Sequence, residues 1–207
     1  MITVIANLKG GTGKSTVNFN LGVWLATHHR VVRLFDLDPQ QTLTDVIDLR
    51  RDEGYSPDLD LRHDYRHLKS STDPNLEVLV DIGTADSKAM NYALKLADKV
   101  VVPVTPSQAD VWSTQRFLRM ITQVRLKTGM PRVVGFINKA DTNSMVRETN
   151  ETAEVLEALP GIKLLKSRLH QRMAFRRSFS EGLSVFELTP ASKAASELNQ
   201  LAEEIIS

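Results

Sequence analysis

The sequence predicts a single α/β domain in which a mostly parallel, twisted sheet is flanked by helices on both faces. Short apolar segments alternate with longer segments of helical periodicity, which is the pattern of repeated βαβ units. A length of 207 residues suits one such domain with a substantial core. A glycine-rich turn joins the first apolar segment to the first helical one, a setting in which parallel-sheet proteins bind phosphate groups.

Each element follows from its own pattern. Six short segments rich in valine, isoleucine and leucine are predicted strands, at residues 2–7, 31–36, 76–81, 99–104, 132–137 and 162–166. Seven longer segments are predicted helices, at residues 14–28, 43–51, 87–96, 111–127, 145–159, 171–180 and 191–206. Residues 51–75 mix charges with prolines and a glycine, which favours a long surface loop with one short helix. We expect residues 1–207 to form one domain, with no N-terminal helix-turn-helix domain.

Composition narrows the classes of function. The net charge is +1 and the chain has no cysteine, which excludes disulfides, thiolate metal sites and cysteine nucleophiles. No apolar run approaches the ~20 residues of a membrane-spanning helix. The chain enters a predicted strand directly, without the pattern of a signal peptide. We therefore expect a cytoplasmic protein, whose attraction to nucleic acid would depend on how its charges are distributed.

The turn after the first strand carries the clearest chemical signal. The residues expected to surround nucleotide phosphates are Lys9, Gly10, Gly11, Thr12, Gly13, Lys14, Ser15 and Thr16. Glycines let backbone N–H groups close around phosphate oxygens, and the N-terminus of the following helix adds its positive dipole end. Lys14 is placed to reach the β- and γ-phosphates, and the Ser15 hydroxyl to ligate Mg²⁺. The sequence therefore predicts a P-loop NTPase.

A second lysine makes this signal more specific. The general pattern has a glycine five residues before the Gly13-Lys14 pair, but Leu8 stands there and Lys9 precedes the two glycines. This arrangement resembles the deviant Walker A motif, KGGxxK[ST], of the ParA/MinD superfamily of P-loop ATPases. In that family the front lysine reaches the nucleotide of a partner subunit. The resemblance implies a catalytic role for Lys9 and Lys14, an ATP-dependent homodimer, and ATP and Mg²⁺ as cofactors.

Two acidic motifs follow predicted strands. Asp36 and Asp38 lie in the run Asp-Leu-Asp-Pro-Gln, and Asp81 ends the strand at 76–81. Carboxylates at the carboxyl ends of parallel strands face the crevice where such sheets bind ligands. The resemblance implies that Asp38 positions the attacking water, that Asp36 lies near the metal, and that Asp81 holds Mg²⁺ through water. For the first pair, two turn-forming acids before a proline are the alternative.

The chain departs from the family after the second acidic motif. Small or proline residues usually follow the aspartate there, whereas residues 82–85 read Ile-Gly-Thr-Ala. The switch segment is therefore not assigned. Asp110, which follows the fourth predicted strand, is either a further site residue or a helix cap.

Two features bear on the base. Residues 138–141 read Asn-Lys-Ala-Asp, which matches the NKxD motif with which GTPases read guanine. ParA-like proteins commonly have an asparagine at this point beside adenine, so the lysine-first loop favours ATP, with Asn138 near the base. The sequence Leu-Thr-Pro ending at Pro190 resembles the family's proline-containing loop beside the adenine ring. A proline at the start of a helix is the alternative reading of Pro190.

Two long segments, residues 111–140 and 163–177, contain basic residues and no acidic ones. Their basic residues are Arg116, Arg119, Arg125, Lys127, Arg132, Lys139, Lys163, Lys166, Arg168, Arg172, Arg176 and Arg177. A polarised basic surface suits the phosphate backbone of DNA without base specificity, although ordinary solvated helix faces are the alternative. The candidate DNA contacts are Arg168, Arg172, Arg176 and Arg177. The last predicted helix has three glutamates and one lysine, so anionic lipid should repel it and no membrane contact is expected.

The resemblance covers nearly the whole chain. Within the superfamily, the chain most resembles the small, ParF-like plasmid partition ATPases. It implies weak, partner-stimulated hydrolysis of ATP to ADP and phosphate, binding of nonspecific DNA, and association with the nucleoid. A small centromere-binding, ParB-like protein would be the partner, and a plasmid or similar cargo would be positioned. The alternatives are an ATPase that positions a conjugation complex or other protein assembly, a GTPase, and a metabolic P-loop ligase.

Overall fold

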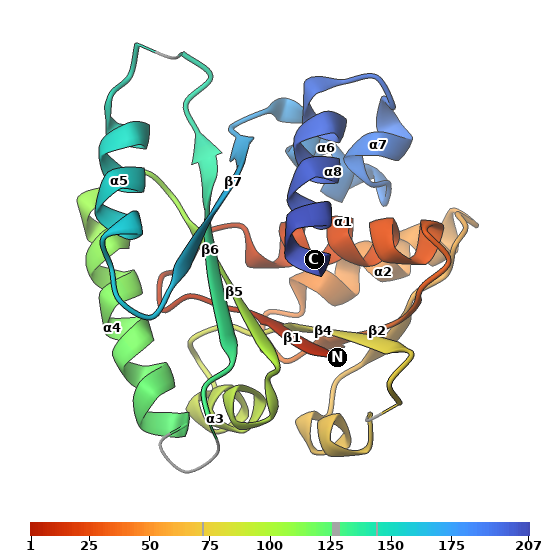
Figure 1. Ribbon diagram of the computed structural model, residues 1–207. Helices are drawn as coiled ribbons and strands as arrows, with labels where there is room; N and C mark the ends of the chain where they lie inside the picture. The colour runs from red at the N-terminus through yellow and green to blue at the C-terminus, as the bar shows by residue number, and fades with distance from the viewer. Residues whose placement is uncertain (72, 126–128, 144) are drawn as a thin grey trace.

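The computed structural model describes residues 1–71, 73–125, 129–143 and 145–207. Its centre is a seven-stranded sheet in the order β3-β2-β4-β1-β5-β6-β7, in which all neighbouring strands are parallel. Helices cover both faces of this sheet (Figure 1). The predicted fold class is confirmed.

The elements follow one another in a β/α alternation. The strands are β1 (Ile2–Ile5), β2 (Val31–Asp36), β3 (Asp60–Arg62), β4 (Leu76–Asp81), β5 (Lys99–Val104), β6 (Arg132–Ala140) and β7 (Lys163–His170). The α-helices are α1 (Lys14–Thr27), α2 (Thr42–Asp52), α3 (Ser87–Leu96), α4 (Gln108–Arg125), α5 (Glu148–Glu157), α6 (Met173–Glu181), α7 (Val185–Leu188) and α8 (Lys193–Ile206). A short 3-10 helix, η1 (Tyr65–Ser70), precedes β4.

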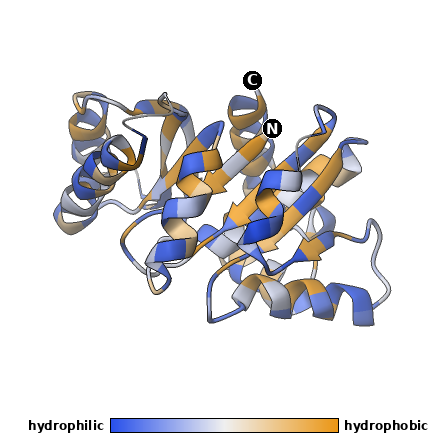
Figure 2. Ribbon diagram, turned by 90° about the horizontal axis from the view of Figure 1, so that it is seen from below, coloured by the Kyte–Doolittle hydropathy of each residue, from blue (hydrophilic) through white to orange (hydrophobic). Residues whose placement is uncertain are grey.

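The central strands supply two hydrophobic cores, one on each face of the sheet. In β5, Val100 and Val102 belong to one core and Val101 to the other, because successive side chains of a strand point to opposite faces. Residues of α3, α4 and α5 complete the first core, and residues of α1, α2 and α8 complete the second. Figure 2 shows hydrophobic residues concentrated along the strands, whereas the helices carry both hydrophobic and hydrophilic residues.

The structure differs from the predicted elements mainly where local pattern is weak. The stretch 51–75 contains the expected short helix, but also β3, whose three residues pair with β2. Asp60 and Arg62 give β3 a polar sequence, and an ion pair of 2.6 Å from Arg33 to Asp60 helps to fix it. The short helix α7 was not predicted, and the last helix starts after Ser192, whose side chain caps it. Lys127, at the predicted end of α4, lies outside the described residues.

A buried arginine joins α2 to the C-terminal part of the chain. Arg50 is 1% exposed and donates two hydrogen bonds, of 2.8 and 2.9 Å, to the two carboxylate oxygens of Glu187 in α7. It also donates to the carbonyl oxygens of Ser56, Pro57 and Gly182. Since the guanidinium is fully paired, its burial is tolerated, and three separate segments are held in one arrangement.

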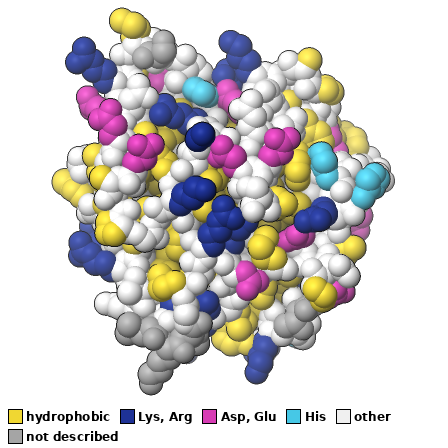
Figure 3. Space-filling model, viewed as in Figure 1, with side chains coloured by type: hydrophobic (Ala, Val, Ile, Leu, Met, Phe, Trp, Pro, Cys, Tyr) yellow, Lys and Arg dark blue, Asp and Glu magenta, His cyan; other side chains and the backbone are white. Residues whose placement is uncertain are grey.

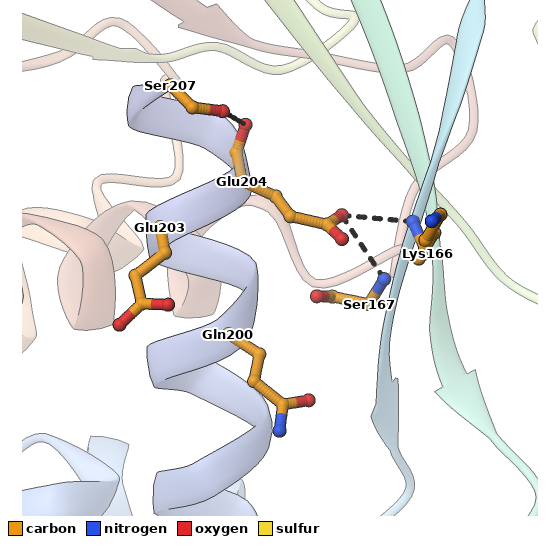
Figure 4. Close-up of a pocket in the computed structure, with 6 residues that line it drawn as sticks. All are labelled: Lys166, Ser167, Gln200, Glu203, Glu204 and Ser207. Carbon is orange, nitrogen blue, oxygen red and sulfur yellow. Dashed lines mark hydrogen bonds between the residues drawn. The ribbon is translucent and has the colours of Figure 1, made fainter.

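The edge strand β7 is covered by α8. The backbone N–H groups of Lys166 and Ser167 both donate to one oxygen of Glu204, at 2.9 and 3.2 Å (Figure 4). The N–H of His170 donates to Glu197 in the same way. The hollow between the two elements, of about 390 Å³, is lined by Lys166, Ser167, Gln200, Glu203, Glu204 and Ser207. It contains none of the predicted site residues.

Replacing Glu187 with Gln should lower the free energy of unfolding by about 3 kcal/mol, because it leaves the buried Arg50 charge without a carboxylate. Urea denaturation of the two proteins measures the difference. The control is Glu181→Gln, which removes the exposed Arg177–Glu181 pair and should cost less than about 0.5 kcal/mol. Equal effects of the two substitutions would contradict the role given to Arg50.

Candidate functional site

A cavity of about 940 Å³ opens at the carboxyl edge of the sheet. Its walls come from the loops that follow β1, β2 and β4, from the end of β6, and from the segment after β7. The ends of β1, β2 and β4 are neighbours because β4 lies between the other two strands. The cavity therefore occupies the crevice in which open α/β sheets bind ligands.

The glycine-rich loop adopts a conformation that only glycine reaches easily. Gly11 and Gly13 have φ values of 73° and 88°, in the left-handed region. Gly13 is also the N-cap of α1, and no side chain caps that helix, so the N–H groups of its first turn remain available. Lys14 is largely buried, and its ammonium lies 3.4 Å from the carbonyl oxygen of Lys9. Backbone donors and one ammonium thus converge on the cavity.

Asp81 lies buried beneath this loop at the end of β4. Its Oδ1 accepts a hydrogen bond of 3.0 Å from the side-chain amide of Asn18, but its Oδ2 has no partner among the described residues. Burial, together with the nearby carboxylates of Asp36 and Asp38, raises the pKa of Asp81 to about 7. An unpaired buried carboxylate oxygen next to Ser15 fits the donor set of Mg²⁺, which prefers oxygen and keeps several waters. No cluster of three or more His, Cys, Asp or Glu side chains competes for a metal in the part of the chain that the structure describes.

Asp36 pairs in register with Asp81 on the neighbouring strand, but its own hydrogen bonds stay within the loop after β2 and the start of α2. Its Oδ2 accepts hydrogen bonds from the backbone N–H and the hydroxyl of Thr44, at 2.9 and 2.7 Å, and its Oδ1 accepts from the N–H of Asp38 at 3.2 Å. It is 3% exposed and is not among the residues that line the cavity. In the structure this carboxylate holds the first turn of α2 and the loop that carries Asp38, and its place near a metal stays a prediction.

Asp38 lines the same cavity as the glycine-rich loop. Its Oδ1 accepts from the N–H of Gln40 at 3.0 Å, and its Oδ2 packs against Gly83. A Cβ atom added at Gly83 would lie 2.2 Å from that oxygen, so a side chain there would displace the carboxylate. The unusual segment after Asp81 thus supplies the space in which Asp38 lies.

The front lysine of the loop is bound within its own chain. Lys9 forms an ion pair with the buried carboxylate of Asp110, which also accepts from the hydroxyl of Ser107. Burial alone would raise the pKa of Asp110, but hydrogen bonds from Lys9, Ser107 and Thr105 hold it below its ordinary value. Ser107, not Asp110, caps α4, because its hydroxyl accepts the N–H of Asp110 at 3.1 Å. The lysine side chain keeps 41% of its exposure.

The end of β6 contacts the same loop from outside. The side-chain amide of Asn138 donates to the carbonyl oxygen of Thr12 at 2.6 Å, and the ammonium of Lys139 donates to that of Gly11 at 2.7 Å. Asp141 lines the cavity but accepts a hydrogen bond from the N–H of Asn143. All three polar positions of the NKxD match are thus at the site, and two of them contact the loop itself.

Part of the cavity wall comes from the end of β7 and from α6, where the sequence analysis places candidate DNA contacts instead. Leu169, His170, Gln171, Arg172, Met173, Phe175, Arg176 and Phe179 line it. Pro190 lies on an exposed turn between α7 and α8 and does not line the cavity, and its place beside the base stays a prediction. Asn18 and Gly83 were also missed. A signal for Asn18 existed, because it lies four residues after Lys14 on a helix and so on the same side.

The predicted DNA contacts are divided between different environments. Arg172 and Arg177 form ion pairs with Glu197 and Glu181, and Arg168 donates to Asn150. Arg176 and Arg172 line the cavity. Figure 3 shows Lys and Arg side chains gathered near the middle of one face, with Asp and Glu side chains among them. The surface is therefore less polarised than the two acid-free segments suggested.

Replacing Asp81 with Asn tests whether burial raises the pKa of this carboxyl group. The folded chain keeps a proton on Asp81 up to about pH 7, whereas the unfolded chain releases it near pH 4. Stability of the wild type relative to the variant should therefore fall as the pH rises from 5 to 8, by about 3 kcal/mol. Urea denaturation in the absence of nucleotide and divalent ions measures this, and a difference that does not change with pH would contradict it.

No helix within the described residues is long and apolar enough to cross a membrane.

Solved structures share the fold. A variant of McdA from Cyanothece in complex with ATP has a TM-score of 0.77 and 20% identity, covering 99% of this chain and 95% of that one. MinD from Pyrococcus horikoshii in complex with Mg-ADP has a TM-score of 0.72 and 20% identity, covering 98% and 94%.

Relatives by sequence extend along nearly the whole chain. The maintenance of carboxysome distribution protein A of Halothiobacillus neapolitanus is 31% identical over 98% of this chain and 94% of its own length. The chromosome-partitioning ATPase Soj of Thermus thermophilus is 27% identical, over 98% and 94%. The family profile of the CobQ/CobB/MinD/ParA nucleotide binding domain matches residues 3–185. With the lysine-first loop and the all-parallel sheet around it, the chain belongs to this ParA/MinD family of nucleotide-binding proteins.

Proposed function

We propose that this protein is a positioning ATPase, which dimerises on ATP, binds DNA without sequence preference and moves a cargo through a partner protein. The observation that carries the proposal is the convergence of Lys14, Ser15 and Asp38 on one cavity, with the buried Asp81 beside them. Its family consists of P-loop ATPases, and the solved relatives bound to ATP and to Mg-ADP support ATP and Mg²⁺ as ligands.

The loop residues bind the phosphates. The N–H groups of residues 10–16 and the Lys14 ammonium neutralise the phosphate oxygens in a partly enclosed cavity, where such contacts are stronger than in water. Ser15 and Asp81 would hold Mg²⁺, which supplies charge stabilisation at the β- and γ-phosphates when bound. The adenine base lies toward Asn138 and the segment 170–173, which also line the cavity.

Asp38 orients the water molecule that attacks the terminal phosphate. Its carboxylate lines the same cavity as the loop, and its neighbours Gln40 and Gly83 fix its position. A carboxylate in this place orients a water for attack on the terminal phosphate. Hydrolysis is slow in the single protein and is stimulated by the partner.

Dimerisation and DNA binding use residues other than those that bind the phosphates and orient the water. Lys9 leaves Asp110 and contacts the nucleotide of a second subunit, which makes dimer formation depend on ATP. Basic residues, including Arg168 and Arg177 and the exposed Arg116 and Arg119 of α4, contact the DNA backbone. A dimer presents each of these twice to one duplex, so ATP raises the affinity for DNA.

A plasmid and a small centromere-binding protein are the first candidates for cargo and partner. A second candidate, a protein assembly, is favoured by the relative named for the maintenance of carboxysome distribution. Deleting the gene for this protein in its own cells distinguishes the two candidate functions. Loss of a plasmid during growth supports partition, whereas stable inheritance together with clustered protein assemblies supports the second candidate.

Replacing Asp38 with Ala should reduce the rate of ATP hydrolysis at least about a hundredfold, because the water is no longer oriented. ATP affinity, measured by calorimetry, should remain, and the ATP-bound dimer should persist in size-exclusion chromatography. The companion variant Lys14→Ala should instead lose ATP affinity. Hydrolysis by the Asp38 variant at the wild-type rate would refute the assignment, and ATP affinity retained by the Lys14 variant would refute the phosphate site.

Replacing Arg168 and Arg177 together with Glu should weaken binding of duplex DNA about tenfold or more at low salt, while ATP affinity is unchanged. Arg172 and Arg176 are left intact because they line the nucleotide cavity. The matched control is Arg30→Glu with Arg66→Glu, two ion-paired arginines that do not line the cavity. Equal DNA affinity in both double variants would exclude the C-terminal segment as the contact surface, and α4 would be tested next.

A further inference from the structure

We infer that Lys139 is a positioning residue for the phosphate-binding loop, and that it braces the loop backbone together with Asn138. The inference rests on the proposed function, because it concerns how the same loop is prepared for a nucleotide. It also assigns a role to the NKxD match, whose expected use was recognition of the base.

The backbone at the end of β6 directs this lysine toward the loop. The pairing of β6 with β7 shifts register between Asn138 and Ala140. Within that irregularity Lys139 has a φ of 55°, in the left-handed region that non-glycine residues seldom occupy. Local irregularities of this kind re-aim a side chain at the end of a strand.

Two adjacent carbonyl groups of the loop receive these side chains. The amide of Asn138 donates to the oxygen of Thr12 at 2.6 Å, and the ammonium of Lys139 donates to the oxygen of Gly11 at 2.7 Å. The remaining oxygen of the Asn138 amide accepts the backbone N–H of Lys139 at 3.0 Å. The pair therefore forms a connected set of hydrogen bonds that ends on the loop.

Holding a carbonyl oxygen also orients the next N–H. In a planar trans peptide the C=O of one residue and the N–H of the following residue point in opposite directions. Fixing the oxygens of Gly11 and Thr12 thus fixes the N–H groups of Thr12 and Gly13, which are donors for phosphate oxygens. Donors that are oriented in advance lose less entropy when the phosphates arrive.

The loop is shaped to admit this contact. A Cβ atom added at Gly13 would lie 2.5 Å from the amide nitrogen of Asn138, so only a glycine allows the side chain to approach the Thr12 carbonyl. This requirement is independent of the φ of 88° at the same residue. Asn138 is also 6% exposed, and the nitrogen and the oxygen of its amide each have one hydrogen-bond partner within the chain.

The test compares Lys139→Met with the wild type. Calorimetry measures the affinities for ATP, for GTP and for inorganic tripolyphosphate, each with Mg²⁺. All three should weaken by the same factor, about tenfold, because the lost contact supports the phosphate loop common to them. The ratio of ATP to GTP affinity should stay constant. Lys139→Arg should retain most of the affinity, since its guanidinium also donates to a carbonyl, and Lys163→Met, at an exposed lysine, should change nothing.

Hydrogen exchange of the nucleotide-free protein separates positioning from direct contact with phosphate. In the Lys139→Met variant the amides of residues 10–15 should exchange faster than in the wild type, with no ligand present. A changed ATP-to-GTP ratio with unchanged tripolyphosphate affinity would overturn the inference in favour of base reading. Unchanged exchange together with weakened phosphate affinity would overturn it in favour of direct contact. Failure of the wild type to bind any nucleotide would instead refute the proposed function.

Discussion

The candidate site depends on one constraint, the parallel direction of all seven strands around a central β1. Parallel strands end at the same edge, and the register aligns Ile5 of β1, Asp36 of β2 and Asp81 of β4 in one row. The loop that follows β1 therefore begins at the level of two carboxylates. Reversing the direction of any one of these strands would move its last residue to the opposite edge and dismantle the site.

The parallel arrangement of the strands also brings carboxylates into the protein interior, where an unpaired charge is unfavourable. Asp81 is buried with one oxygen unpaired, and burial raises its pKa to about 7. Asp36 and Asp110 are equally buried, but the first has hydrogen bonds to Thr44 and the second an ion pair with Lys9. One oxygen of Asp110 also lacks a hydrogen-bond partner, but Asp110 has an ion pair with Lys9, whereas no ion pair to Asp81 is formed among the described residues. Charge pairing therefore distinguishes Asp81, where a cation would bind, from Asp110, although both are buried aspartates.

The features that could be predicted from the sequence are those that depend on residues close together in the chain. Strands with continuous valine and isoleucine, the lysine-first loop and Asp81 at the end of β4 all depend on neighbouring residues, and the structure has these elements where they were expected. Other features of the site depend on contacts that no local pattern shows. The sequence places Asp36 near the metal, and its pattern does not show that the backbone N–H and the hydroxyl of Thr44 both donate to one of its oxygens. Periodicity also does not show that the chain after β7 brings Gln171 and Met173 to the cavity wall, while Pro190 lies outside it.

Covering of β7 has a consequence for assembly. An uncovered edge strand offers its N–H groups to a strand of another molecule, which is the usual route to open-ended sheet association. Here the N–H groups of Lys166, Ser167 and His170 already donate to glutamates of α8. A strand from another molecule would have to displace two carboxylates before it could pair along this part of the edge. Association of molecules through this part of the sheet edge would therefore require α8 to give up these contacts first.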